Sequence, residues 1–225
     1  MFRTLALALA LTTAVAAAPA KAEYADAKDI VDKSQITFQR VLRDEEMGPR
    51  VKALMQRAKG VMIFPSILKG AFFIGGEGGS GVLMGRYANG AWSYPAFYTM
   101  GSVSFGLQIG GQASEAVLII MTQRGLQSIL DDQVKLGADI SAAAGPVGAG
   151  AEAATTTAAG ADIYVYSLNQ GLFVGAALEG AVIAKRNDWN TEFYKKSATP
   201  EQIVRENTVS NAAADPLRGT VEAVK

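Results

Sequence analysis

The stretch Gly70–Gly111 of the chain reads GAFFIGGEGGSGVLMGRYANGAWSYPAFYTMGSVSFGLQIGG. Short apolar runs alternate in it with glycines and aromatic residues, a composition that suits strands whose backbones pass close together in a twisted sheet. Asn89-Gly90 lies between two strand-like runs, and it predicts a hairpin because both central residues of a type I′ turn need a positive φ. The stretch therefore predicts a glycine-rich antiparallel β-sheet.

Residues 76–81 of this stretch, GEGGSG, also match the dinucleotide-binding pattern G-x-G-x-x-G. That pattern binds a pyrophosphate only when a helix follows it, because the helix N-terminus holds the anion. Here the strand-like run Val82–Ala88 follows instead, and no acidic residue lies between Glu77 and Glu115 to hold a ribose. We therefore assign this motif to the glycine-rich sheet and expect no cofactor.

The first 22 residues have the three parts of an export signal. Arg3 and the terminal amine form a charged region, Leu5–Ala18 is apolar, and Ala20-Lys21-Ala22 is an A-x-A cleavage site. The apolar part is too short to span a bilayer. We expect residues 1–22 to be a cleaved signal peptide and the mature protein to be periplasmic or secreted.

The residue inventory excludes several classes of function. The chain has no cysteine and no histidine, so it can form neither a disulfide nor a Ser-His-Asp or Cys-His catalytic site, and it lacks a lipoprotein cysteine. Adjacent Asp131 and Asp132 cannot both face one metal ion on a helix. An S-x-x-K match at Ser66–Lys69 lacks the K-T-G element of penicillin-recognising enzymes. We expect no enzyme and no metal site.

The charge balance argues against nucleic acid as a partner. Removal of Arg3 and Lys21 from the 21 basic residues leaves 19 against 21 acidic residues, a net charge of −2. A nearly neutral chain has no global field that attracts nucleic acid, so any anion must bind to a local cationic patch.

Periodicity organises the chain into helices at both ends around consecutive hairpins. Helices are expected at 24–43, 49–59, 122–131, 188–194 and from 200, and strands at 61–64, 71–74, 82–87, 91–94, 102–109, 115–121, 163–168 and 172–178. Thr199-Pro200 with Gln202 predicts a capping box. The pattern indicates an α+β fold with an antiparallel sheet that is able to curl into a partial barrel, in one domain over 23–206, with a flexible tail over 207–225.

The helix expected at Pro49–Lys59 carries cations on both sides of an apolar stripe and no acid among them. The stripe contains Val51, Leu54, Met55 and Ala58, Arg50 and Arg57 lie on one side of it, and Lys52 and Lys59 lie on the other. Interfacial helices have this arrangement, because cationic side chains reach lipid phosphates while the stripe enters the bilayer surface. A surface helix packed on the core shows the same stripe, so both interpretations stay open here.

Six phrases, taken in order, resemble the SYLF domain family. They are KGVMIFP at 59–65, GSGVL at 79–83, WSYP at 92–95, GLQIG at 106–110, AGPVG at 144–148 and GLFVG at 171–175, and the resemblance covers residues 30–194. The resemblance implies lipid binding: eukaryotic members bind phosphoinositides, some bind or bundle actin, and many bacterial members are envelope lipoproteins. This chain departs in lacking the lipoprotein cysteine and in having Lys195 where the family tends to have glycine, which we expect to alter only a turn.

Together these observations predict a non-enzymatic, exported protein that docks reversibly on anionic phospholipid headgroups. Arg50, Lys52, Arg57 and Lys59 would contact phosphates, Val51, Leu54 and Met55 would enter the interface, and Lys69 and Arg86 are further candidates. The alternative is a structural or protein-interaction module of the cell envelope that pairs with another protein or with itself. An exposed sheet face that carries Phe72, Phe73, Tyr98 or Phe105 would favour this alternative.

Overall fold

The computed structural model describes residues 24–71, 75–104, 110–131, 133–145, 160–169, 172–173, 178 and 180–224. Its helices are α1 (Tyr24–Arg43), α2 (Gly48–Met55), α3 (Gln123–Asp131), α4 (Asn187–Tyr194), α5 (Pro200–Val204) and α6 (Asp215–Glu222). Its strands are β1 (Gly60–Ala71), β2 (Gly75–Gly85), β3 (Ala96–Ser104), β4 (Gly110–Ile120), β5 (Val134–Lys135), β6 (Ala142–Ala144), β7 (Ile163–Asn169), β8 (Leu172–Phe173) and β9 (Val182–Lys185). The expected signal peptide lies outside the described residues.

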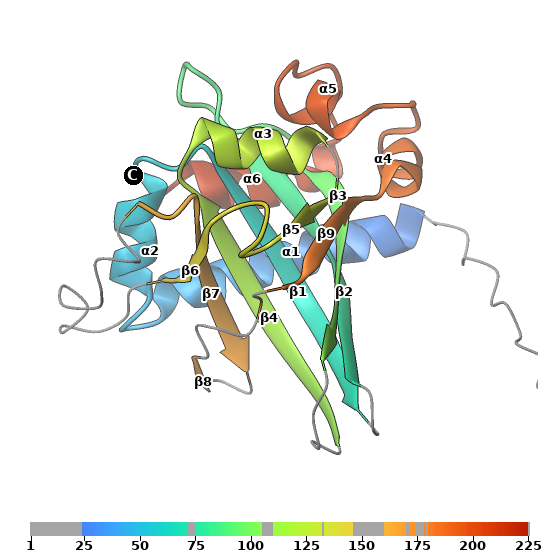
Figure 1. Ribbon diagram of the computed structural model, residues 1–225. Helices are drawn as coiled ribbons and strands as arrows, with labels where there is room; N and C mark the ends of the chain where they lie inside the picture. Colours follow the sequence, from blue (N-terminus) through green and yellow to red (C-terminus); the bar gives the residue numbers. More distant parts are fainter. Residues whose placement is uncertain are drawn as a thin grey trace, which may run out of the picture.

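The strands form one nine-stranded sheet, curled into a half-barrel (Figure 1). The order is β5-β9-β3-β2-β1-β4-β7-β6, with β8 also paired to β7, and all pairs are antiparallel except β6 with β7. The predicted α+β class and the antiparallel, partly barrel-like sheet are confirmed.

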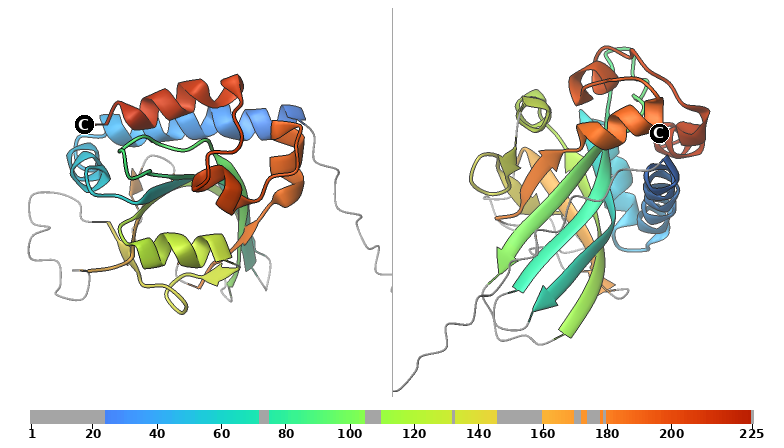
Figure 2. Two further views of the ribbon diagram at one scale, coloured as in Figure 1. Left: turned by 90° about the horizontal axis from the view of Figure 1, so that it is seen from above. Right: turned by 90° about the vertical axis from the view of Figure 1, so that its right-hand side faces the viewer.

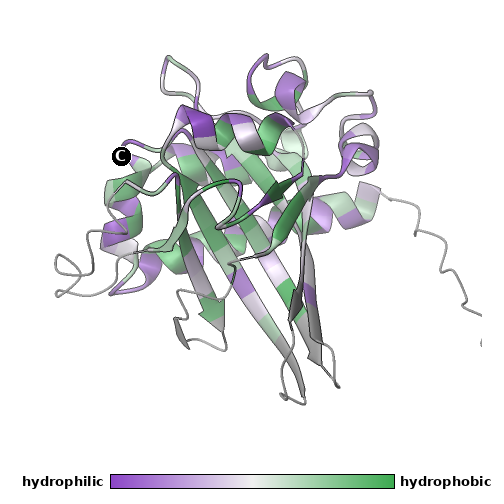
Figure 3. Ribbon diagram, viewed as in Figure 1, coloured by the Kyte–Doolittle hydropathy of each residue, from purple (hydrophilic) through white to green (hydrophobic). Residues whose placement is uncertain are grey.

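Helices cover both sides of the curled sheet. Viewed from above, α1 and α6 lie side by side on one side and α3 lies on the opposite side (Figure 2). Hydrophobic residues concentrate in the part of the sheet that these helices cover (Figure 3). Phe38 and Val41 of α1 are fully buried there, as are Met62 and Ile63 of β1. Within the described residues, none of the helices combines the length and the apolar character that crossing a bilayer requires.

The glycine-rich motif belongs to the sheet, as predicted, and it forms part of a strand that begins earlier than the expected residue 82. Residues 75–85 form β2, and the residues that follow it make a turn instead of a phosphate-binding helix. Two of the motif's glycines allow β2 to lie against the irregular part of β1, where the register shifts between Ile63 and Leu68. A Cβ at Gly79 would lie 2.2 Å from the carbonyl oxygen of Ser66, and a Cβ at Gly81 would lie 2.4 Å from that of Ile63. The motif therefore serves close strand packing.

The chain reverses at Asn89-Gly90, but the turn is not of type I′. The amide of Gly90 donates to the carbonyl of Tyr87 (3.0 Å), and the amide of Tyr87 donates to the carbonyl of Ala91 (2.8 Å). Gly90 has a φ of 86°, and Asn89 is not among the residues with positive φ. These bonds close a three-residue loop in which only glycine is left-handed, a common hairpin alternative. The expected strand at 91–94 is reduced to one bridge between Arg86 and Trp92.

The expectation of a flexible tail from residue 207 is wrong for residues 207–224. Asp215–Glu222 form α6, in which Leu217 and Val221 are fully buried. The hydroxyl of Tyr94 donates to Asp215 (2.8 Å), and the guanidinium of Arg218 lies 4.6 Å from the centre of the Tyr94 ring. The segment is mostly polar, which favoured the prediction of a tail, but Leu217 and Val221 lie one helical turn apart and pack on the core.

Lys195 occupies the turn that ends α4, in the position where helices often have glycine. Its φ is 52° and its ψ is 26°, which is the left-handed conformation. The side chain pairs with Glu192 and lies 5.0 Å from the centre of the Tyr24 ring. The capping box at the start of α5 is also present, with Thr199 and Gln202 bonded to each other's backbone.

Candidate functional site

Helix α2 is held at both of its ends by side chains that lie outside it. Before the helix, the carboxylate of Asp44 accepts hydrogen bonds from the amides of Glu46 (2.9 Å) and Met47 (2.8 Å). After it, Nη1 of Arg86 donates to the carbonyls of Gln56 (2.7 Å) and Met55 (3.3 Å). An anion before a helix and a cation after it both complement the helix dipole. Arg86 thus has a structural role at the end of α2.

The apolar stripe of α2 faces the core and not an open surface. Val51 is 0 % exposed, Met55 1 % and Leu54 8 %, and Ala58 is buried beside them. While α2 stays on the core, these side chains cannot enter a lipid interface, so the expectation that Val51, Leu54 and Met55 dip into a bilayer is corrected. A stripe of this width is what any core-facing helix presents.

The four cations of the helix region have different environments. Lys52 and Arg57 are exposed, whereas Arg50 and Lys59 are partly buried. Burial raises the pKa of Tyr166, and the positive charge of Arg50 works against that rise, which places Arg50 close to this buried phenol. Among the described residues, Lys52, Arg57 and Lys59 have no ion-pair partner within 4.0 Å.

The segment after α2 holds Arg57 and Lys59 in fixed positions between α2 and β1. The amide of Lys59 donates to the carbonyl of Ile120 (2.7 Å), and its carbonyl accepts from the amide of Arg86 (2.9 Å). The backbone of Lys59 is therefore bonded on both sides. Arg86 therefore lies beside this segment, since its amide binds Lys59 and its side chain binds the carbonyl of Gln56. We call Arg57, Lys59 and Arg86 the cationic ledge.

Two cavities meet at this ledge, and both are lined by Arg57 and Lys59. The first has a volume of about 380 Å³ and the second about 570 Å³. The first is also lined by Gln56, Ala58, Arg86, Tyr87, Ala88, Gly90 and Gln123, and the second by Met121, Thr122, Gly160, Ala161 and Tyr164. No carboxylate lines either cavity within the described residues. The arrangement suits an anion with several oxygen atoms.

Lys69 is far from this ledge. Its backbone lies in β1 opposite Glu77 and Gln112 of the neighbouring strands. Ten residues of strand separate it from Lys59, which corresponds to roughly 30 Å. The sequence-derived set of cations therefore divides, and the structure brings together Arg57, Lys59 and Arg86.

A buried carboxylate behind the second cavity was missed by sequence reasoning. The side chain of Asp162 is 2 % exposed, and it accepts hydrogen bonds from Thr122 (2.5 Å), Ser141 (2.7 Å) and the guanidinium of Arg124. Burial by itself raises the pKa of Asp162, but these three donors outweigh it and hold the pKa at about 2. Asp162 thereby fixes Thr122, which lines the cavity. The sequence around Asp162 does not predict this network, because Thr122, Arg124 and Ser141 lie more than twenty residues before it in the chain.

We expect Asp162 to make the stability of the protein depend on pH. Its pKa is about 2 in the folded protein, below the usual 3.8, so its contribution is present above pH 4 and is lost as the pH falls from 4 towards 2. The shift corresponds to about 2 kcal/mol. Urea unfolding of the wild type and of Asp162→Asn between pH 2 and pH 7 measures this contribution. The variant should lose this part of the pH dependence, and Asp26→Asn, at an exposed position, should keep it.

Comparison with known proteins places the chain in a family. The family described as "Ysc84: Las17-binding protein actin regulator" matches residues 101–224. The chain belongs to the SYLF (Ysc84) family. The matched residues include α6, so this helix lies within the part that SYLF proteins share. The family description names binding and regulation. Separately, within the described residues, no group of three acidic side chains lies close enough together to hold a metal ion.

The SYLF relatives include proteins from yeast and from animals. The chain is 35% identical over 183 residues to LAS seventeen-binding protein 3 of Saccharomyces cerevisiae, which covers 80% of this chain and 39% of the relative. It is 29% identical over 165 residues to SH3 domain-containing YSC84-like protein 1 of Homo sapiens, which covers 73% of this chain and 48% of the relative. The chain thus spans less than half the length of these relatives. Their names indicate protein partners.

Proposed function

We propose that this SYLF protein is exported, is not an enzyme, and docks reversibly on anionic phospholipid headgroups. The cationic ledge makes the contact, and the phosphates enter the two cavities that meet at Arg57 and Lys59. The observation that carries this proposal is that two adjoining cavities share two cations and have no carboxylate in their described lining. A periplasmic or secreted location with peripheral attachment to a membrane follows from the same proposal.

The docking is electrostatic and superficial. Since Val51, Leu54 and Met55 are buried, the apolar stripe of α2 takes no part in docking, and the contact is made by Arg57, Lys59 and Arg86. Each cation near an anionic surface contributes about 1 kcal/mol, so the ledge gives a weak attachment. Salt screens such contacts within a Debye length of about 10 Å at 0.1 M ionic strength.

Vesicle flotation tests this proposal. We expect the protein to float with phosphatidylglycerol vesicles at low salt, to stay behind with phosphatidylcholine, and to detach from phosphatidylglycerol at high salt. Arg57→Glu/Lys59→Glu should reduce the floated fraction at least tenfold, because the double variant replaces attraction by repulsion. Lys135→Glu/Lys196→Glu changes the net charge by the same amount at two exposed positions elsewhere and should float like the wild type.

Equal flotation on both lipids, or equal losses in the two double variants, would contradict docking through the ledge. Thermal unfolding of each variant verifies that the fold is intact.

A protein-interaction module is the second candidate, and the relatives named for binding Las17 favour it. The structure corrects one of its expected contact residues: Tyr98 is fully buried, and its hydroxyl donates to the carbonyl of Ile129 (3.2 Å). Phe72, Phe73 and Phe105 lie outside the described residues. Leu68, whose exposed fraction is 64 %, is an apolar side chain open to a partner or to a second copy. A Leu68→Ser variant that changes the oligomeric state in light scattering, with flotation absent in the wild type, would support this candidate.

A further inference from the structure

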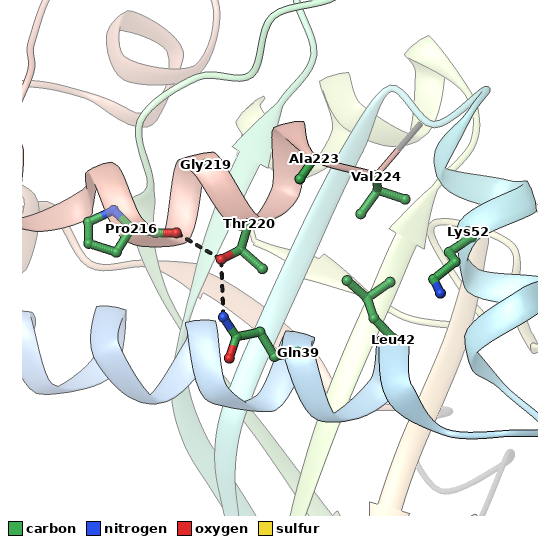
Figure 4. Close-up of a pocket in the computed structure, with 8 residues that line it drawn as sticks. All are labelled: Gln39, Leu42, Lys52, Pro216, Gly219, Thr220, Ala223 and Val224. Carbon is green, nitrogen blue, oxygen red and sulfur yellow. Dashed lines mark hydrogen bonds between the residues drawn. The ribbon is translucent and has the colours of Figure 1, made fainter.

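A groove separate from the ledge lies between α1, α2 and α6 (Figure 4). Its volume is about 680 Å³, and it is lined by Gln39, Leu42, Lys52, Pro216, Gly219, Thr220, Ala223 and Val224. Five of these eight residues are apolar or lack a side chain, one is a cation and none is an acid. This volume is within the range of sites that take small molecules.

The polar side chains on the floor of the groove already have partners. The hydroxyl of Thr220 donates to the carbonyl of Pro216 (2.8 Å) and accepts from the amide nitrogen of Gln39 (3.4 Å) (Figure 4). At the end of α6, the amides of Ala223 and Val224 donate to the carbonyls of Gly219 (3.0 Å) and Val221 (3.3 Å), so these amides are also bonded. An occupant that brings its own amide groups, such as an extended peptide, would leave them without partners at a cost. An alkyl chain has no such cost.

The cation lies at one end of the groove. Lys52 is exposed, has no ion-pair partner among the described residues, and faces Leu42 and Val224 in Figure 4. If the occupant is an apolar chain with a negative group at its end, the negative group therefore meets the ammonium of Lys52 and the chain meets the apolar residues along the groove.

We propose that this groove binds one anionic single-chain amphiphile. The alkyl chain lies between α1 and α6, along Leu42, Pro216 and Ala223, and the anionic group meets the ammonium of Lys52. This goes beyond headgroup docking, because it assigns Lys52 and α6 a site for an individual molecule. The site does not use Arg57 or Lys59.

Isothermal titration with dodecanoyl lysophosphatidylglycerol, below its critical micelle concentration, tests the proposal. We expect saturable binding at one site. Glycerophosphoglycerol, which has the same head and no chain, should not bind. Lysophosphatidylcholine of the same chain should bind about fivefold more weakly, and Lys52→Gln should remove this preference, in line with roughly 1 kcal/mol for one cation.

Gly219 offers a variant that fills the groove. A Cβ at this residue meets no heavy atom within 4 Å, so a larger side chain enters open space without a clash. Gly219→Trp should weaken binding of the lysolipid at least tenfold, whereas Gly219→Ala adds one methyl group to the same helix and should bind within twofold of the wild type. Ala223→Trp is a second blocking variant if Gly219→Trp fails to fold, as judged by circular dichroism.

The controls separate this site from the ledge. Arg57→Glu/Lys59→Glu should keep lysolipid binding, and Gly219→Trp should keep flotation. No saturable binding by the wild type, equal binding of glycerophosphoglycerol, or wild-type affinity in a folded blocking variant would each overturn the proposal.

Discussion

Replacement of Gly81 by alanine is expected to destabilise the protein by about 3 kcal/mol or more, a large share of the stability of a typical domain. The added Cβ would lie 2.4 Å from the carbonyl oxygen of Ile63 and 2.5 Å from the ring of Phe64. Phe64 is fully buried, so its ring cannot turn out into solvent to make room. The pairing of β1 with β2 must shift, and urea unfolding followed by circular dichroism measures the loss.

Gly101→Ala is the matched control for this prediction. Gly101 lies in β3, which pairs with β2 on the side away from β1, and the nearest atom to its Cβ is the carbonyl oxygen of Glu77 at 3.8 Å. That distance is an ordinary contact, so we expect a change within about 1 kcal/mol. A loss as large as that of Gly81→Ala would show that close packing against β1 is not the reason for the glycine.

Leu217→Ala should destabilise the whole domain by about 3 kcal/mol, because it removes a fully buried side chain. Leu217 anchors α6 beside α1, together with Val221 and the contacts of Asp215 and Arg218 to Tyr94. Deletion of residues 207–225 should abolish cooperative unfolding. Urea titration measures the first effect and thermal unfolding the second.

Leu68→Ala supplies the control for α6, since it is the same substitution at an exposed leucine of β1. Its expected effect is within about 0.5 kcal/mol. If Leu217→Ala were equally mild, α6 would contribute little to the fold, and the expectation of a loose tail would regain support.

Local periodicity accounts for what was predictable from the sequence. Helix α1 begins and ends at the predicted residues, 24 and 43, and its buried residues Val31, Phe38 and Val41 follow helical spacing. Helix α3 forms within the predicted range 122–131 and buries Leu126, Ile129 and Leu130, which are spaced three and four residues apart. In both helices, the spacing of the apolar residues within the helix itself is enough to predict the helix and its buried side.

Long-range contacts account for what was not predictable. The role of α6 depends on Tyr94, which lies more than a hundred residues earlier in the chain. The direction of the stripe on α2 depends on which surface packs against it, so the sequence left the interfacial and core-facing interpretations open. The cations of the ledge were visible in the sequence, but the bonds of Arg86 to Met55 and Gln56 join segments thirty residues apart.

Because hydrogen bonds hold the cationic ledge in place, we expect the protein to attach to a bilayer and to leave it quickly. An isolated helix as short as α2 is marginal in water, and its shape here depends on Asp44 and Arg86. Folding has thus already ordered the backbone that carries Arg57 and Lys59, so meeting a bilayer restricts only side-chain rotations, about 0.5–1.5 kcal/mol for each. Attachment and release then require no refolding, and a change of ionic strength suffices to reverse them.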